Sequence, residues 1–230
     1  MQLINISHKD VVKMATAEIH ERPILVQFPN VFVLLAAPTL KGAQQLDALK
    51  IRLQGKNYGT AIGSLNRFLA QANTTALPSE FCTTSQFRAL KGTFLRLPFR
   101  DNTFQSHTIR NGTHQGLLLG GTYNKLFRTI EASFQNYPPE EMWSKHNYCA
   151  PLCTSANISG HPDGSITTFD KALDFAKDRG IHLFITNKRP AKELGSYPIF
   201  GFEPNKISIH RDGPGLAMFK EKIPVGLRNW

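Results

Sequence analysis

The chain has 230 residues, of which 41% are hydrophobic, and it carries a formal net charge of +10 at pH 7 with a pI of about 9.7. That length is enough to bury a sizeable core, in one large domain or two small ones. No apolar run reaches the roughly 18 residues that a membrane span needs, which excludes a transmembrane helix and gives no reason to expect a membrane partner. The polar start, Met1–Asp10, also argues against a signal peptide.

The excess of Lys and Arg favours a polyanionic partner such as RNA or a nucleotide. These residues are dispersed along the chain, so a basic protein with no such partner is the alternative. The cysteines Cys82, Cys149 and Cys153 are odd in number, and without a secretion signal they are expected to be reduced thiols in a cytoplasmic protein. Cys149 and Cys153 lack the further ligands of a zinc site, so no metal is expected there.

The N-terminal part of the chain predicts a helix and then a strand region. Apolar residues repeat at helical spacing from Val11 to about Glu21, with Ser7 as the expected N-cap and Asp10 three residues later. Residues 24–28 and 31–37 are apolar and β-branched, and Pro29-Asn30 separates them. They indicate two buried strands, or one strand bent at the proline.

The next predicted helix begins at the cap Thr39 and ends in two cations. Lys50 and Arg52 lie two residues apart, and residues with that spacing do not share a helix face. They can reach one anion only if the helix ends between them. Cations in a last turn also complement the helix dipole, an alternative that needs no ligand. Lys56 follows in a Gly-containing turn.

The remaining elements alternate without a strict βαβ rhythm, which predicts a mixed sheet with helices packed on it. Further strands are expected at residues 60–63, 93–97, 181–186 and 207–210. Further helices are expected after the cap Ser64, across Tyr123–Phe134, and from the cap Thr167 to Gly180. Residues 73–85 and 136–145 are predicted to be loops. The expected organisation is a single domain, 1–230, in which residues 216–230 form a basic surface tail.

The most informative stretch is Pro151–Gly160, where an apolar start leads into small polar residues. Thr154, Ser155 and Asn157 are short donors and acceptors, and after a strand they would line the rim of a cavity. A polar turn before a helix uses the same residues and is the alternative. No phosphate loop of the GxGxxG or GxxxxGK[ST] type is present, and no His is placed by sequence to activate Ser155.

What remains is a set of anion and hydroxyl binders, which suits catalysis by positioning and electrostatic stabilisation. The set is Lys50, Arg52, Lys56, Thr154, Ser155, Asn157 and Arg211.

The run Thr154–Gly160, preceded by Lys50 and Arg52 at a helix end, resembles the Sua5/YrdC/YciO family. Its most specific part is Ser-Ala-Asn-x-Ser-Gly, and the resemblance extends from about Ser7 to Gly215. Residues 90–98 resemble the family's Pro-Gly-Pro-x-Thr strand, with Gly92 and Thr93 kept. Residues 207–213 resemble its closing strand, which places Arg211 in the site.

The resemblance implies an α/β (α+β) fold with a twisted, mostly mixed sheet and helices around a large basic cavity. It implies a nucleotidyltransferase that makes threonylcarbamoyl-adenylate from threonine, bicarbonate and ATP for tRNA modification, with Mg²⁺ on the phosphates. Lys50 and Arg52 would hold phosphates as catalytic residues. Lys56, Thr93, Thr154, Ser155, Asn157 and Arg211 would bind nucleotide or substrate. Members have also been described as binding double-stranded RNA.

The sequence departs from the family in the part that would bind the amino acid. The family's Pro-Thr-Glu-Thr-x-Tyr-Gly loop is shortened to Pro29-Asn30, and Gly116–Gly121 stands where the family has a strand ending in Arg. These losses leave two hypotheses. One is a nucleotide-binding enzyme that forms a carbamoyl-adenylate. The other is a non-catalytic module that binds tRNA, double-stranded RNA or a nucleotide.

Overall fold

The computed structural model of the chain describes residues 1–51, 57–136, 140–144, 147–160, 162, 164–187 and 194–230. Within these residues the strands form one mixed sheet in the order β1-β8-β2-β3-β7-β4-β6-β5-β9-β10-β11. The predicted mixed sheet with packed helices is therefore confirmed. The strands are β1 (Gln2–Asn5), β2 (Ile24–Gln27), β3 (Phe32–Ala36), β4 (Gly59–Ala61), β5 (Thr93–Pro98), β6 (Thr113–Leu118), β7 (Leu152–Ser155), β8 (Leu183–Thr186), β9 (Ile199–Glu203), β10 (Lys206–Arg211) and β11 (Arg228–Asn229).

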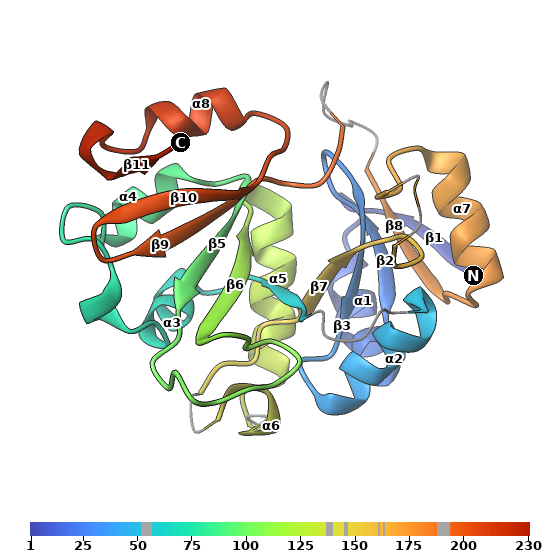
Figure 1. Ribbon diagram of the computed structural model, residues 1–230. Coiled ribbons are helices and arrows are strands. Elements are labelled where there is room, and N and C mark those ends of the chain that lie inside the picture. The colour runs from blue at the N-terminus through green and yellow to red at the C-terminus, as the bar shows by residue number, and fades with distance from the viewer. Residues whose placement is uncertain (52–56, 137–139, 145–146, 161, 163, 188–193) are drawn as a thin grey trace.

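Helices cover both faces of this sheet (Figure 1). One face packs against α1 and α5, and the other packs against α2, α3, α4 and α7. The helices are α1 (Val11–Glu21), α2 (Leu40–Lys50), α3 (Leu65–Ala70), α4 (Thr84–Ala89), α5 (Gly121–Ser133), α6 (Glu140–Trp143), α7 (Phe169–Asp178) and α8 (Leu216–Glu221), with 3-10 turns at Thr74–Ala76 and Val225–Leu227. In the described part of the chain, no helix has the length and apolar character to cross a membrane.

The apolar runs at residues 24–28 and 31–37 form two strands, β2 and β3, which pair antiparallel across the Pro29-Asn30 turn. Successive side chains of a strand point to opposite faces. Phe32 and Leu34 accordingly pack on the α2 side, and Val33 and Leu35 pack on the α1 side. Burial on both faces explains why this segment is apolar throughout instead of alternating with polar residues.

Strand β7 carries the Pro151–Gly160 stretch into the middle of the sheet. It pairs antiparallel with β3, where Val33 lies opposite Ser155, and with β4, where Gly59 lies opposite Cys153. The polar end of β7 therefore emerges between two strands from the N-terminal half of the chain. This pairing answers the question left open by the sequence, because Thr154 and Ser155 end a strand and Asn157 follows it.

Two of the expected helix caps are confirmed and two are wrong. The side chains of Thr39 and Ser64 accept from the backbone N–H groups of Gly42 and Arg67, at 3.1 and 3.4 Å. Ser7 does not cap α1; its hydroxyl donates to Asn5 Oδ1, and the N-cap is Asp10, which makes no side-chain cap bond. Helix α7 has Thr168 as its N-cap instead of Thr167, again with no side-chain bond.

The structure adds elements where the sequence predicted loops. Helix α4 lies at the end of the predicted loop 73–85, and α6 lies inside the predicted loop 136–145. Helix α4 begins with a capping box in which Thr83 accepts from Gln86 N–H and Gln86 Oε1 accepts from Thr83 N–H. The surrounding Thr and Ser residues, which favour turns, hid this Thr-x-x-Gln signal. Strand β1 also lies in the polar start of the chain, for which the sequence predicts no strand.

The C-terminal segment differs from the predicted surface tail. It forms α8 and β11, and β11 pairs parallel with β10. Phe219, Ile223 and Leu227 are buried in the core on the α2 side of the sheet. These apolar residues recur among the Lys and Arg residues of the segment, whose abundance concealed them.

This packing predicts that Phe219→Ala lowers the free energy of unfolding by about 3 kcal/mol, because a buried aromatic side chain leaves a cavity. The neighbouring Met218 is 51% exposed, so Met218→Ala serves as the control and should change stability by less than about 0.5 kcal/mol. Urea unfolding of both variants measures the difference. Equal, small effects would mean that the segment is a surface tail after all.

Candidate functional site

A central cavity of about 140 Å³ opens where β3, β4, β5, β6 and β7 lie side by side. It lies on the face of the sheet that α1 and α5 cover elsewhere. Its lining residues are Val31, Val33, Asn57, Gly59, Phe94, Gln115, Leu117, Cys153, Thr154, Ser155, Ser196, Tyr197 and Arg211. This enclosed volume suits a ligand the size of an amino acid or a phosphate. A whole nucleotide would extend out of it, since pockets for larger ligands measure about 300–1,000 Å³.

The polar loop at the end of β7 is held from behind by Lys50. The Lys50 ammonium donates to the backbone oxygen of Ser155, to the backbone oxygen of Asn157 at 3.1 Å, and to Asn157 Oδ1 at 2.6 Å. Ser155 Oγ donates to the same Oδ1 at 3.0 Å. Lys50 is only 2% exposed, and an ammonium has three N–H donors. The contacts therefore make Lys50 a brace that fixes the shape of the loop.

Helix α2 ends at Lys50. This end is required if Lys50 and Arg52 are to reach one anion. Ile51 is the C-cap and adopts a left-handed conformation with φ 47°. A β-branched residue rarely adopts this conformation, and it costs of order 1–2 kcal/mol. The left-handed conformation at Ile51 therefore ends the helix directly after Lys50. Arg52 and Lys56, two of the predicted phosphate-binding residues, lie outside the described residues.

Arg211, at the end of β10, supplies positive charge to the central cavity. Its Nε and Nη2 atoms donate to the backbone oxygen of Tyr197 at 3.0 and 2.7 Å, and its guanidinium lies 5.5 Å from the centre of the Phe94 ring. Nearby protein atoms partly desolvate the guanidinium, which lowers the pKa of Arg211, although the residue as a whole stays solvent-exposed. Further N–H groups of the fork remain to bind a carboxylate or a phosphate.

A second arginine stands behind Gln115, a residue that lines the cavity. Arg96 on β5 donates to Gln115 Oε1 through Nε at 3.2 Å and Nη2 at 2.7 Å, and its Nη1 donates to His210 Nδ1 at 2.9 Å. A guanidinium only donates, so His210 Nδ1 is unprotonated in this contact. Desolvation and the neighbouring Arg96 lower the pKa of His210. The network fixes the amide of Gln115 at the cavity wall.

The cavity also has neutral, buried groups in its wall. Burial raises the pKa of the Cys153 thiol and of the Tyr197 hydroxyl far above their ordinary values. Both groups therefore stay protonated near neutral pH. The Cys153 thiol is not activated as a nucleophile, because nucleophilic attack needs the thiolate. The described lining can position ligands and compensate charge, but it offers no activated thiol for covalent chemistry.

The structure brings some of the predicted site residues together and separates others. Thr154, Ser155 and Arg211 line the central cavity, and Lys50 and Asn157 hold the loop behind it. Thr93 is fully buried, and its hydroxyl donates to Leu90 O at 2.9 Å, so it fixes the start of β5 and is not part of the described lining. Sequence reasoning did not select Gln115 or Tyr197. Gln115 lies in the polar first half of β6, Thr113–Gln115, which carries no local signal for a cavity wall.

The two regions that depart from the family, the Pro29-Asn30 segment and β6, both lie next to the central cavity. The Pro29-Asn30 segment is a tight turn closed by Phe28 N–H donating to Val31 O at 3.0 Å, and apolar Val31 and Val33 follow it into the cavity. From β6, the described lining takes Gln115 and Leu117, neither of which is a cation. The positive charge at the cavity therefore comes from β10 instead of β6.

Comparison with known proteins adds to this geometry. No family model and no curated protein sequence matches the chain. Among solved structures, it is similar to P. abyssi Sua5 complexed with L-threonine, with a TM-score of 0.72 and 16% identity, covering 100% of this chain and 63% of that one. It is also similar to E. coli YciO, with a TM-score of 0.62 and 11% identity, covering 93% and 96%.

A third similar structure is HypF in its phosphate- and nucleotide-bound form, with a TM-score of 0.62 and 15% identity, covering 87% of this chain and 28% of that one. The chain thus spans less than two thirds of the length of P. abyssi Sua5 and about a quarter of HypF. The similarity of the backbone extends over nearly the whole chain at low sequence identity. The chain therefore has the YrdC-like fold of the Sua5/YciO/YrdC family.

Proposed function

We propose that this chain binds ATP at the central cavity and uses it to form a carbamoyl-adenylate of the threonylcarbamoyl-adenylate type, from bicarbonate and an amino acid, for tRNA modification. The observation that carries the proposal is the loop Ser155–Asn157, braced by Lys50 at the rim of a cavity that Arg211 makes positive. Two proteins with this fold support it, since one structure holds L-threonine and another holds phosphate and a nucleotide.

The proposed reaction needs no protein nucleophile. The amino group of the amino acid combines with bicarbonate to give a carbamate and water. A carbamate oxygen then bonds to the α-phosphorus of ATP, the bond from that phosphorus to the β-phosphate bridging oxygen breaks, and pyrophosphate leaves. Catalysis of such a transfer rests on positioning and charge stabilisation, which fits a wall built of hydroxyls, amides and a guanidinium.

Each residue has a role that follows from its place. The Ser155 hydroxyl and the Gln115 amide orient ligand atoms inside the cavity, and the Arg211 guanidinium faces the negative charge of a carboxylate or phosphate. Lys50 acts as a positioning residue through Asn157. Contact of Lys50 with a phosphate stays a prediction, and it would require the ammonium to exchange one of its present acceptors.

Magnesium enters the proposal as part of the substrate, Mg·ATP. Among the described lining residues there is no carboxylate, and no group of three His, Cys, Asp or Glu side chains converges in the described chain. Mg²⁺ usually keeps several waters and binds substrate phosphates. The hydroxyl and amide oxygens of the lining are compatible with such a hydrated ion but would not hold it alone.

Binding of ATP tests the site directly. We expect Ser155→Ala and Asn157→Ala each to weaken ATP binding about tenfold, because each removes a hydrogen-bonding group from the rim, and Asn157→Ala also removes an acceptor of Lys50. Thr129→Ala, which removes an exposed hydroxyl on α5, is the matched control and should leave binding within about twofold. Calorimetric titration with Mg·ATP measures all of these variants. If all three bind ATP like the parent chain, the nucleotide does not use this rim.

The choice of amino acid is a separate prediction. We expect threonine to support only weak pyrophosphate release, because the shortened Pro29-Asn30 turn and β6 supply no hydroxyl, carboxylate or cation to recognise it. When polar groups that should pair on binding stay buried and unpaired, the reaction with that substrate can be slower by several orders of magnitude. Pyrophosphate release from ATP and bicarbonate is measured with each amino acid in turn. Robust release with threonine would show that Arg211 and Gln115 have taken over the lost contacts.

The alternative function, a non-catalytic RNA-binding module, is favoured by the net charge of +10. If the charge binds RNA phosphates, the affinity for tRNA and duplex RNA should fall linearly on a logarithmic salt scale and show little sequence preference. A filter-binding titration between about 50 and 200 mM salt checks this. Absence of binding even at the lowest salt would remove nucleic acid as a direct partner.

A further inference from the structure

A second cavity, of about 500 Å³, lies outside the central site and shares no described lining residue with it. It is bounded by the turn from β4 into α3, the connection from α4 to β5, and one face of α5. The α5 residues that line it, among them Asn124, Arg128 and Glu131, repeat at helical spacing. They form a polar stripe beside the apolar stripe that packs α5 on the sheet.

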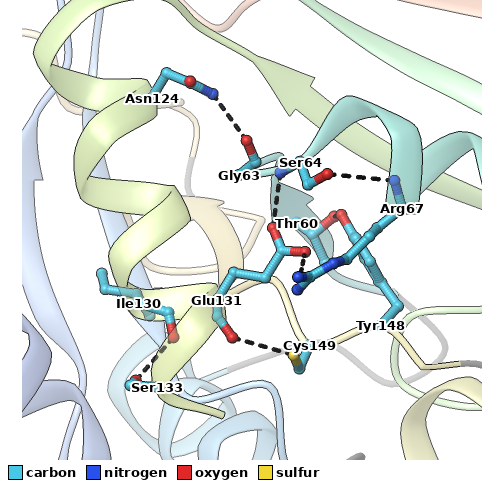
Figure 2. Close-up of polar contacts among 10 residues, drawn as sticks. All are labelled: Thr60, Gly63, Ser64, Arg67, Asn124, Ile130, Glu131, Ser133, Tyr148 and Cys149. Carbon is cyan, nitrogen blue, oxygen red and sulfur yellow. Dashed lines mark hydrogen bonds and ion pairs between the residues drawn. The ribbon is translucent and has the colours of Figure 1, made fainter. Parts of the chain in front are cut away.

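Hydrogen bonds from α5 side chains tie down the floor of this cavity (Figure 2). Ser64 N–H donates to Glu131 Oε2 at 2.8 Å, and Asn124 Nδ2 donates to Gly63 O at 3.1 Å, so two α5 side chains hold the β4–α3 turn. A Cβ atom at Gly63 would lie 2.9 Å from the backbone N and Cα of Arg128 and closer still to the Glu131 carboxylate. The turn therefore packs directly on the helix with no room for a side chain.

The one carboxylate in the described lining is already engaged. Glu131 is 1% exposed, and its Oε1 accepts from Arg67 Nη1 at 3.3 Å. Burial raises the pKa of Glu131, while the Ser64 N–H and Arg67 favour its charged form. Whether charged or neutral, Glu131 faces Arg67 and the turn. It does not offset positive charge at the rim.

Three further cations converge on the rim from different elements: Arg88 from α4, Lys91 from the α4–β5 connection and Arg128 from α5. All three are exposed, and none forms an ion pair with any residue that the structure describes. The Lys91 stem lies near the start of α5, where a Cβ at Gly120 would be 3.7 Å from Lys91 Cδ. Like charges gathered around one hollow repel each other unless an anion joins them.

We propose that this second cavity binds the phosphate groups of a small phosphorylated ligand. Arg and Lys are the side chains that recognise phosphate, the volume is that of a small-molecule pocket, and the fixed floor means that little has to be ordered on binding. The concave shape favours a small ligand over a nucleic-acid backbone. This site is independent of the ATP site proposed above.

The probe is inorganic tripolyphosphate, titrated calorimetrically into the full chain without Mg²⁺. We expect Arg128→Gln to weaken binding about fivefold or more, through loss of a charge-assisted contact. Lys125→Gln is the matched control, because Lys125 is an exposed cation on the same helix that is not part of the described lining; it should change affinity less than about twofold. Arg88→Gln should act like Arg128→Gln, and the double variant should lose most of the binding.

Further measurements separate this proposal from the others. Tripolyphosphate should raise the melting temperature of the parent chain clearly more than that of the double variant, in which only the central cavity could still bind it, since a ligand stabilises only a state that binds it. In a chain that carries Ser155→Ala, adding Arg128→Gln should still weaken tripolyphosphate binding by the same factor as in the parent chain. This holds whatever Ser155→Ala does to ATP binding. Equal losses in the Arg128 and Lys125 variants would overturn the proposal. It would also be overturned if Arg128→Gln weakened duplex RNA binding and left tripolyphosphate binding unchanged.

Discussion

The Lys50 ammonium, buried at the end of α2, joins two parts of the chain that lie more than a hundred residues apart, and the central site depends on it. Its acceptors are the backbone oxygens of Ser155 and Asn157 and the amide oxygen of Asn157. A buried charge is tolerated only where such partners surround it. The contact therefore fixes the polar loop at the end of β7 and ties it to the left-handed turn at Ile51.

Helix α5 links the two cavities through its two stripes. Tyr123, Phe127 and Ile130 pack on the sheet face that also forms the wall of the central cavity. Asn124, Arg128 and Glu131 face the second cavity and hold the turn before α3. One helix thus supports β6, which carries Gln115, and also presents the cations of the second rim. A shift of this helix would alter both cavities.

Much of the fold could be predicted from the sequence, because its signals are local. The caps Thr39 and Ser64 and the apolar spacing of α1 and α5 depend only on neighbouring residues. Strand β1 carries few local signals, since it pairs with β8, for example Gln2 with Leu183, far away along the chain. The cavity lining is hard to predict from the sequence for the same reason, because strands that are distant in the chain bring its residues together. Gln115 and Arg96 meet because β5 pairs with β6, and His210 joins them because β9 and β10 follow in the sheet order.

The source of positive charge at the central cavity decides how a ligand would lie there. Arg211 comes from β10, and the braced Ser155–Asn157 loop comes from β7, so a ligand bound by both would span the enclosed space. That space is about 140 Å³, which accommodates the carboxylate or carbamate end of a small molecule. Under the proposed function, the nucleoside part of ATP would extend out of this space, because a whole nucleotide is larger than the cavity. In that proposal the α-phosphate would lie at the rim, within reach of a carbamate oxygen held inside the cavity.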